Sequence, residues 1–316
     1  MSFTLCVGEA LIDFVAQTKV DDVGASELFR RAAGGAVANV AVGIARLGGE
    51  VHFAGTLGRD PFGRFLLRTL AHENVNVDGV RLVDAPTTLA FVARGERGSR
   101  DFFFLRHPGA DSQLTTTDIF SHELAHTRTL HFGGVLLSSD PGRSTCLVAA
   151  ASARRAGALV SFDPNARPQL FDSPEEMRRW LIAGCAAADL VKLSEEDLAG
   201  LGVPLDHAAE LINEITRAVI VSRGERGCRW INADGESGEV ESPQVNVVDT
   251  TGAGDAMMAA ILWRLAQTSA AKLSGAVLAD AARYGCAAGA LACLREGAIP
   301  SLPTAAEIEA MISRVP

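Results

Sequence analysis

The chain has 316 residues, 48% of them hydrophobic, which is enough to bury a sizeable core in one large α/β domain or in a core with a small appendage. Its formal net charge of −9 and its lack of basic blocks argue against nucleic-acid binding and favour a small-molecule partner. The six cysteines have no CxxC pairing and are typical of reduced thiols, and no apolar run is long enough to cross a bilayer, so a cytoplasmic protein is expected.

The N-terminal segment carries the first candidate binding residue. Residues 3–8 are predicted to form a buried strand, and Glu9 and Asp13 follow it. In open α/β sheets, ligands bind beyond the carboxyl ends of the strands. Asp13 lies between apolar neighbours and therefore needs hydrogen-bond donors, which the hydroxyl groups of a sugar supply. The alternative is a solvated turn residue.

A glycine pair, Gly34 and Gly35, precedes a stripe of apolar residues at helical spacing. Asn39 lies off that stripe and can offer both a donor and an acceptor to a ligand that lies over the glycines. The alternative is that the glycines only form a tight turn. A strand over residues 51–55 and a helix capped by Asp60 are predicted to follow.

The pattern then changes to two extended runs, residues 88–94 and 101–106, which predict a hairpin joined by residues 95–99. A hairpin within an alternating strand-helix chain suggests a lid beside the main sheet. Arg106 ends the second run. It is either a donor for a substrate oxygen or a solvated strand end.

Residues 122–126 contain HExxH, in which His122 and His126 would bind zinc and Glu123 would act as a base. The flanking sequence predicts only a short helix, and no third ligand follows at helical spacing. We therefore interpret this match as a chance occurrence on a surface helix, with a zinc hydrolase as the least favoured alternative.

Beyond Pro141 the chain alternates between predicted helices and strands, which indicates a doubly wound α/β plan. The predicted helices are 144–156, about 175–185 and 276–294, and the predicted strands are 159–163, 190–193 and 218–222. A further strand, 130–137, is predicted before Pro141. Polar loops at 163–167, 194–197 and 222–227 follow three of these strands. They are therefore expected to converge at one edge of the sheet.

The segment 249–255 reads DTTGAGD and precedes another apolar helical stripe. The start of a helix offers unpaired N–H groups, and glycines let an anion approach them. Asp255, in the first turn, can take a proton from a hydroxyl group that attacks a phosphoryl group, or it is only a helix cap. The motifs GxxxxGK[ST] and GxGxxG are absent, so any phosphate chemistry must use this other cradle.

Two segments resemble the signatures of a known family. Residues 249–256 are similar to the C-terminal signature of the ribokinase-like, or PfkB, carbohydrate kinases, and residues 33–49 are similar to their N-terminal signature. Within that family, further segments are most similar to fructokinases: 8–15, 101–111, 143–150, 161–171, 227–230 and 297–304. The resemblance implies a doubly wound, mainly parallel sheet flanked by helices, as one domain over residues 1–316. Its small β lid would come from segments near 14–33 and 86–111.

The resemblance also implies a reaction: ATP-dependent phosphorylation of a sugar hydroxyl, most closely the 6-hydroxyl of fructose. Mg²⁺ would accompany the nucleotide, and two copies of the chain would pair through the lid. Asp255 would be the general base, and the anion hole would be formed by Gly252, Ala253 and Gly254. The sugar contacts would fall on Asp13, Gly34, Gly35, Asn39 and Arg106. The nucleotide side would fall on Asn165, Arg167, Ser222, Gly224 and Gly227, with a possible potassium site near Asp249 and Thr251.

The sequence departs from the family at its NxxE motif, where Ser194 and Asp197 stand in place of Asn and Glu. This change weakens a metal-binding role for these residues. The nearest alternative is a kinase for 2-keto-3-deoxygluconate or another sugar, because Arg106 could meet the carboxylate of an acid sugar. A non-catalytic sugar- or nucleotide-binding protein is a third alternative. Asp255 argues against it, since a pure binder gains nothing from a carboxylate beside a phosphate.

Overall fold

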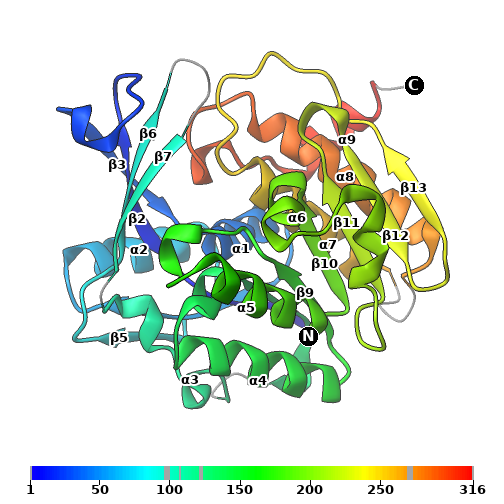
Figure 1. Ribbon diagram of the computed structural model, residues 1–316, viewed down its shortest axis with the longest axis horizontal. Helices are drawn as coiled ribbons and strands as arrows, with labels where there is room; N and C mark the ends of the chain where they lie inside the picture. Colours follow the sequence, from blue (N-terminus) through cyan, green and yellow to red (C-terminus); the bar gives the residue numbers. More distant parts are fainter. Residues whose placement is uncertain (1, 96–99, 107, 121–123, 269–272, 315–316) are drawn as a thin grey trace.

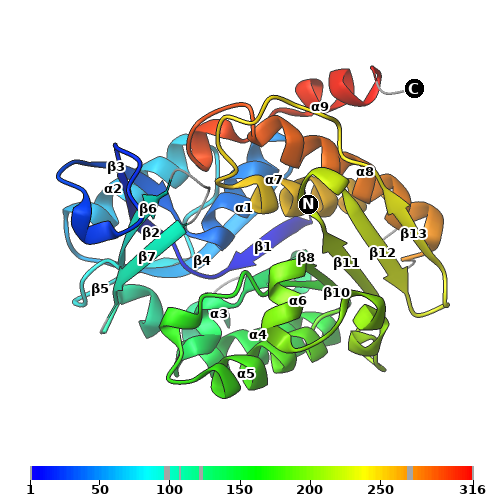
Figure 2. The ribbon, with the colours of Figure 1, turned by 45° about the horizontal axis from the view of Figure 1, so that its top comes forward.

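The computed structural model of the chain describes residues 2–95, 100–106, 108–120, 124–268 and 273–314. Among these, nine strands form the main sheet, in the order β13-β12-β11-β10-β9-β8-β1-β4-β5, and four form a second sheet, in the order β3-β2-β6-β7. We call the second one the small sheet. Helices cover both faces of the main sheet, and the small sheet stands to one side of it (Figures 1 and 2).

The main sheet is mostly parallel. Its strands are β1 (Phe3–Val7), β4 (Val51–Gly58), β5 (Val80–Val83), β8 (Thr127–Gly133), β9 (Leu159–Asp163), β10 (Leu190–Ser194), β11 (Ala218–Ser222), β12 (Cys228–Asn232) and β13 (Ser237–Val240). Among the described strands of the main sheet, only the β11–β12 and β12–β13 pairs are antiparallel. Every residue of β1 and β9 is buried, as expected of parallel strands covered on both faces.

The strand order reverses beside β1. The chain proceeds from β1 to β4 and β5 on one side, and later from β8 to β11 on the other. Ligands bind in open α/β sheets at such a switch point, beyond the carboxyl ends of the strands. The fold therefore places the expected site beyond β1 and β8.

Each face of the main sheet has its own layer of helices and its own hydrophobic core (Figure 2). One layer contains α1 (Ala36–Arg46), α2 (Pro61–His72), α7 (Ala253–Ala266), α8 (Gly275–Ala292) and α9 (Ala305–Ile312). The other contains α3 (Thr116–Phe120), α4 (Gly142–Arg155), α5 (Pro174–Ala186) and α6 (Glu195–Leu201). Helix α7 packs against both α1 and α8, so its N-terminus is held firmly at the centre of its layer.

The small sheet is assembled from two separate segments. Strand β2 (Leu11–Ala16) follows soon after β1 and pairs with β3 (Phe29–Gly34) and β6 (Leu89–Arg94), and β6 pairs with β7 (Arg100–Leu105). The β6–β7 pair is the predicted hairpin, whose connecting residues 96–99 lie outside the described part of the chain. Asp13 therefore lies on a strand of the small sheet rather than on a loop after β1.

One predicted strand is wrong in its second half. Strand β8 ends at Gly133, and Val135–Ser138 form a 3₁₀ helix where the sequence pattern predicts a strand through residue 137. A Cβ atom on Gly134 would overlap the carbonyl oxygen of Pro164, so the chain passes closely by the loop after β9 and turns there. The other predicted strands and helices correspond to elements of the structure, whereas β5, β12, β13 and α9 have no counterpart among the predictions.

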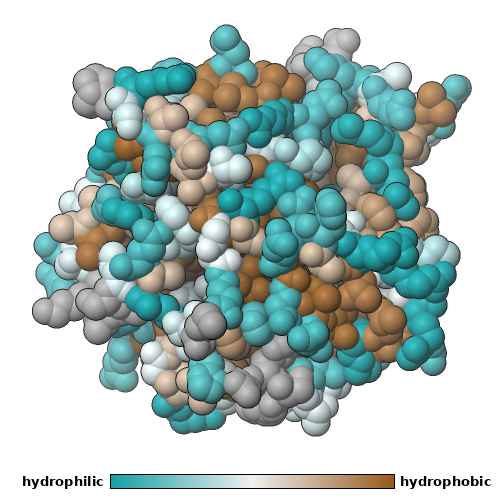
Figure 3. Space-filling view, turned by 180° about the vertical axis from the view of Figure 1, so that it is seen from behind, coloured by the Kyte–Doolittle hydropathy of each residue, from teal (hydrophilic) through white to brown (hydrophobic). Residues whose placement is uncertain are grey.

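Within the described ranges, no helix is both long and apolar enough to cross a membrane. Seen from behind, the molecular surface mixes hydrophilic and hydrophobic side chains (Figure 3).

Candidate active site

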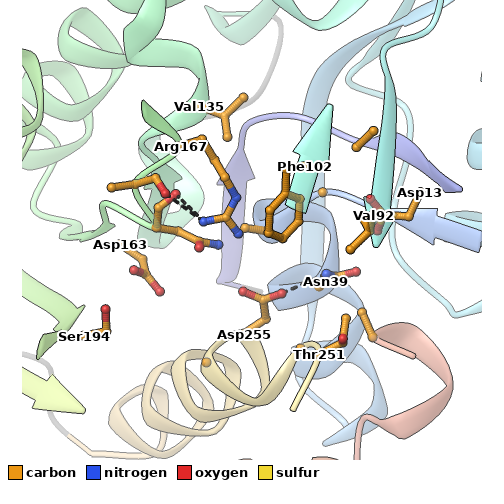
Figure 4. Close-up of a pocket in the computed structure, with 18 of the residues that line it drawn as sticks. Asp13, Asn39, Val92, Phe102, Val135, Asp163, Arg167, Ser194, Thr251 and Asp255 are labelled. Atoms are coloured by element: carbon orange, nitrogen blue, oxygen red, sulfur yellow. Dashed lines mark hydrogen bonds between the residues drawn. The ribbon is translucent and has the colours of Figure 1, made fainter. Parts of the chain in front are cut away.

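A cavity of about 450 Å³ lies between the main sheet and the small sheet. Loops after β1, β8, β9, β10 and β11 line one side of it, and side chains of β2, β6 and β7 line the other. Figure 4 shows side chains from both sides pointing into this shared space. The expected convergence of polar loops at one edge of the sheet is therefore confirmed. We call this space the polar cavity.

The N-terminus of α7 opens into the polar cavity. Gly252 precedes the helix with a φ of 79°, a left-handed conformation that favours glycine. A Cβ atom there would also lie only 2.9 Å from the Cα of Ala298. No side chain caps the helix, so the N–H groups of Gly254 and Asp255 are available to an anion, whereas the N–H of Ala253 donates to the carbonyl oxygen of Thr250 at 3.3 Å. The predicted start of a helix at these glycines is confirmed, and their role as a phosphate cradle stays a prediction.

Asp255 lies buried in the first turn of α7 and faces the polar cavity (Figure 4). The amide nitrogen Nδ2 of Asn39, on α1, donates a hydrogen bond to Oδ2 of Asp255 at 2.8 Å. Burial raises the pKa of Asp255, although this hydrogen bond and the charges of Lys192 and Arg167 oppose the rise. A carboxylate with a raised pKa is a better proton acceptor, so the geometry suits a general base.

Asp13 faces the polar cavity from β2, on the small-sheet side (Figure 4). Burial raises its pKa to about 7; the positive charges of Arg167 and Arg94 oppose the rise, and the carboxylate of Asp255 adds to it. A carboxylate in this setting gains most from a ligand that donates hydrogen bonds to it. The structure thus brings the two predicted carboxylates together across the cavity.

The glycine pair before α1 is required by close packing. A Cβ atom on Gly34 would overlap the carboxylate of Asp13. Gly35 has a φ of 104°, and a Cβ atom there would lie 2.6 Å from the carbonyl oxygen of Glu9. The glycines therefore bring the backbone beside Asp13 and the start of α1, which is more than a tight turn requires.

Glu9 has a role that sequence analysis did not predict. Its Oε1 accepts a hydrogen bond from the backbone N–H of Ala36 at 2.7 Å, so it caps α1 from the end of β1. The other oxygen, Oε2, is buried and has no hydrogen-bond partner in the structure. Burial raises the pKa of Glu9 to about 7. Only the position of Glu9 at a strand end could have signalled this.

Arg167 and Asn165 come from the loop after β9. Arg167 reaches into the polar cavity between Phe102 and Asp255, although the sequence placed it on the nucleotide side (Figure 4). Its guanidinium lies 5.5 Å from the centre of the Phe102 ring, and its Nη1 donates to the backbone oxygens of Asn165 and Ala166. Asn165 also lines the cavity, and its φ of 38° is unusual for a residue other than glycine.

Arg106 is not among the residues that line the polar cavity. Its guanidinium is buried and donates to Oδ2 of Asp111 at 2.8 Å and to Oγ of Ser138 at 2.6 Å. The structure therefore does not bring Arg106 to the other predicted sugar contacts. Instead, it joins the end of β7 to the turn after β8.

A second cavity, of about 420 Å³, adjoins the polar one. The two share wall residues Ser222, Gly224, Thr250 and Gly254. The second cavity is also lined by Gly227 and by mostly apolar or small residues, which include Val245, Val247, Met257, Cys286 and Ala290. We call it the apolar cavity. The predicted nucleotide residues Ser222, Gly224 and Gly227 therefore lie together on the wall of the apolar cavity, which Asp13 does not line.

The residues in place of the family NxxE motif form a local hydrogen-bonded unit. Ser194 and Asp197 cap α6 reciprocally, each side chain accepting from the other residue's backbone N–H. Oδ1 of Asp197 also accepts from the backbone N–H of Ala166 at 2.8 Å. The carboxylate of Asp197 therefore accepts hydrogen bonds mainly from the protein itself, and these bonds hold the neighbouring loops in place.

Arg94 extends from β6 to the loop before α7. Its Nη2 lies 2.9 Å from Oδ2 of Asp249 and donates to Oγ1 of Thr251 at 2.9 Å. Asp249 also accepts from the backbone N–H groups of Thr251 and Gly297. The side chains predicted to lie near potassium are therefore already paired with a positive charge of the chain itself, and the small sheet is attached to the anion-hole loop.

Lys192 is a cavity residue that sequence analysis missed. It lies on β10, and its Nζ donates to Oδ2 of Asp163 at 2.8 Å; both side chains are buried and line the polar cavity. A lysine within an otherwise apolar strand was the only signal available in the sequence.

The HExxH segment is only partly covered, because His122 and Glu123 lie outside the described residues. Among the residues that are described, no three His, Cys, Asp or Glu side chains are grouped so as to hold a metal ion.

A doubly wound fold that directs a helix N-terminus into a cavity, with a buried carboxylate in its first turn, defines a class of protein. This class is that of the phosphotransferases that act on hydroxyl groups of small molecules. Comparison with known proteins gives the family. The chain matches the model of the pfkB family of carbohydrate kinases over residues 1–305, and it belongs to that family. It therefore transfers a phosphoryl group to a sugar hydroxyl, as the two signature segments implied.

Several fructokinases are similar to the chain over nearly its full length. A probable chloroplastic fructokinase-6 of Arabidopsis thaliana is 39% identical, over 99% of this chain and 83% of its own. The crystal structure of a Xylella fastidiosa fructokinase with bound ATP is 34% identical and covers 98% of both chains, with a TM-score of 0.90. A Vibrio cholerae O395 fructokinase with fructose, ADP and calcium ion bound is 33% identical and covers 99% of both chains, with a TM-score of 0.88. The predicted ribokinase-like fold is confirmed by these matches.

Proposed function

We propose that the chain is an ATP-dependent fructokinase, which converts D-fructose and ATP to D-fructose 6-phosphate and ADP. The observation that carries the proposal is the position of Asp255, which lines the polar cavity directly after Gly254, a residue that lines both cavities. A sugar fits the polar cavity, and a nucleobase fits the apolar one. Full-length similarity to fructokinases, one of them with fructose and ADP bound, supports this choice of substrates.

The roles of the residues follow from their positions. Asp13 and Asn39 would hold the hydroxyl groups of the sugar, beside the backbone of Gly34 and Gly35. Asp255 would accept the proton of the 6-hydroxyl as its oxygen attacks the γ-phosphorus of ATP. The N–H groups of Gly252, Ala253 and Gly254 would stabilise the negative charge of the transferred group. The bond from the γ-phosphorus to the β,γ-bridging oxygen breaks, and ADP leaves with that electron pair.

The protein's own side chains would contribute little to metal binding. Because no group of potential ligands is seen in the described residues, Mg²⁺ would be held mainly by phosphate oxygens and water. A potassium ion would have to displace the guanidinium of Arg94 to reach Oδ2 of Asp249.

The main alternative substrate is an acid sugar such as 2-keto-3-deoxygluconate. Its carboxylate would need a free positive charge, but Arg106 is paired with the buried Asp111. The surroundings of Arg106 therefore favour an uncharged sugar such as fructose.

We also propose that the small sheet is a lid and that two lids pair in a homodimer. Strand β7 is at the edge of the small sheet, and its side chains Phe103 and Leu105 are 52% and 49% exposed. An apolar edge strand is a favourable surface for a second copy of the chain. Sedimentation should show a dimer for the wild type and a monomer for Phe103→Asp. If both proteins are monomers, or both are dimers, the proposal is contradicted. The buried, reduced thiols of Cys6, Cys146, Cys185, Cys228 and Cys286 support a cytoplasmic location.

The decisive experiment measures ADP release from Mg-ATP with fructose, 2-keto-3-deoxygluconate, ribose, glucose and a nucleoside. The expected result is the highest kcat/KM with fructose, and a loss of several orders of magnitude in kcat for Asp255→Asn with ATP binding retained. Higher turnover of another sugar would refute fructose as the substrate. Near-normal turnover by Asp255→Asn would refute its role as the base.

A further inference from the structure

Lys192 has an unusual environment for a lysine. It is one of three lysines in the sequence, and it is only 4% exposed in the middle of β10. Burying an ammonium group is costly unless it is paired, and here the pair is the carboxylate of Asp163 on the neighbouring strand. A salt bridge of this kind adds little to stability compared with an apolar pair, so its presence calls for another explanation.

The ammonium group lies next to the anion hole. A Cβ atom built on Gly254 would lie 3.0 Å from Nζ of Lys192, and Gly254 lines both cavities. Lys192 is also close enough to Asp255 for its charge to lower the pKa of that carboxyl. A phosphoryl group passing from the apolar to the polar cavity must therefore pass close to this ammonium.

Lys192 is positively charged in this setting. Burial alone would lower its pKa, but the neighbouring carboxylates, Asp163 foremost, raise it above its ordinary value. Nearby His131 stays neutral, because burial lowers its pKa to about 3. Of the three protons on the ammonium, one is donated to Asp163, and the described residues give the ammonium no other acceptor. The remaining N–H groups are available to a ligand in the cavity.

The residues in place of the family NxxE motif, Ser194 and Asp197, do not provide a positive charge. Ser194 and Asp197 are engaged in capping α6, and Asp197 also holds the backbone of Ala166. Phosphoryl transfer depends on neutralising charge on the non-bridging oxygens. Lys192 has the charge, the free donors and the position to do so.

We propose that Lys192 is a catalytic residue whose ammonium donates hydrogen bonds to the non-bridging oxygens of the transferred phosphoryl group, beside the N–H of Gly254. Asp163 is its positioning residue. The proposal rests on the proposed use of ATP. Lys192 keeps its protons throughout: the sugar oxygen bonds to the γ-phosphorus, the hydroxyl proton passes to Asp255, and the electron pair of the broken bond leaves with ADP.

The test compares Lys192→Met with the double variant Lys192→Met/Asp163→Asn, which leaves no unpaired buried carboxylate. We expect both variants to lose roughly 100- to 1,000-fold in kcat, the range for removing one oxyanion donor, while the Kd of ADP stays within about threefold. We also expect aluminium fluoride, which mimics the transferred group, to tighten ADP binding in the wild type with sugar present but not in the variants. Arg46→Met is the matched control. It removes a partly buried ion pair with Glu73, neither of which lines the two cavities, and should lower stability without changing kcat.

Two results would overturn the proposal. One is a folded double variant with kcat within about fivefold of the wild type. The other is an equal loss of ADP affinity and of kcat, which would indicate a structural or nucleotide-anchoring role. All variants are assayed with the sugar that the wild type turns over best. If that sugar is not fructose, the proposed function fails, and the assignment of Lys192 is still decided.

Discussion

The two cavities that meet at Gly254 have similar volumes, about 450 and 420 Å³, but they are built from different residues. The polar cavity contains the carboxylates of Asp13 and Asp255 with the charges of Arg167 and Lys192 around them. The apolar cavity is lined mainly by small and hydrophobic residues of α8 and the loop before α7. The polar cavity, where bonds would form and break, would hold its ligand by charge and hydrogen bonds. The apolar cavity would select its ligand by shape. Substitutions at the two ends should therefore affect different substrates.

Among substitutions that change substrate binding rather than the transfer step, the largest effect is expected at the glycine pair. Gly34→Ala would place a methyl group against the carboxylate of Asp13 and push it from its position. Losing hydrogen bonds to a charged group costs about 1.5–3 kcal/mol, so KM for fructose should rise roughly 10- to 100-fold. Steady-state kinetics with a Kd measurement for ADP checks this. Gly200→Ala, which meets only ordinary contacts on α6, is the control. An equal rise in KM for ATP would contradict the separation of the two ends.

A smaller effect on the sugar is expected from Arg94→Met, which detaches the small sheet from Asp249 and Thr251. With the lid less often closed, KM for fructose should rise about tenfold, because a hydrogen bond to a charged group is worth roughly 1.5 kcal/mol or more. Arg30→Met removes an exposed ion pair between β3 and Glu296 and should change KM less than about twofold. Equal effects in both variants would show that Arg94 has no special role.

At the apolar end, Val247 lines the cavity and Val248 does not, although they are 60% and 61% exposed. Val247→Asp removes part of the apolar wall, at a cost of about 1 kcal/mol, so KM for ATP should rise roughly fivefold while KM for fructose stays constant. Val248→Asp is the matched control and should behave like the wild type. If the two variants behave alike, the apolar cavity is not the nucleobase site.

The smallest effect concerns stability and pH. Burial raises the pKa of Glu9 from its ordinary 4.5 to about 7, so the folded chain binds this proton more tightly than the unfolded chain. The contribution of Glu9 to the free energy of unfolding is fully present below pH 4.5 and is lost as pH rises towards 7. Glu9→Gln cannot ionise, so urea unfolding should show a shallower fall of stability over that range.

The control for Glu9→Gln is Glu73→Gln. The hydrogen bond from Arg46 lowers the pKa of Glu73, so this carboxylate contributes stability above its ordinary pKa that is lost as pH falls. Its substitution should therefore weaken the protein at neutral pH and make the fall of stability below pH 4.5 shallower, while the slope between pH 4.5 and 7 stays as in the wild type. An unchanged pH slope in Glu9→Gln would show that Glu9 is not protonated in the folded chain.

Sequence analysis predicted much of the main sheet, because buried parallel strands are short apolar runs and amphipathic helices have a clear period. It also pointed to Asp255, Asn39 and Gly35, which line the polar cavity, since each glycine motif precedes a helix. These signals are local. The hydrogen bond from Asn39 to Asp255 spans 216 residues, so only packing of the whole fold could reveal it.

The residues that were missed or misplaced lack such local signals. Lys192 interrupts an apolar strand and could equally have faced solvent. Arg106 stands at a strand end and could equally have contacted the sugar, but the structure pairs it with Asp111. The cap that Glu9 provides to α1 joins elements whose relative position depends on tertiary packing. Hydrophobic periodicity therefore does not predict which side chains of different helices and strands contact one another.

The location of Asp13 on β2 has a consequence for the fate of ATP when no sugar is present. Asp13 belongs to the small sheet and Asp255 to α7, so a sugar large enough to reach both would hold the two bodies together. A water molecule is too small to do this. Water beside Asp255 would therefore meet a site that is less well closed, and futile hydrolysis of ATP should be much slower than phosphorylation of the sugar.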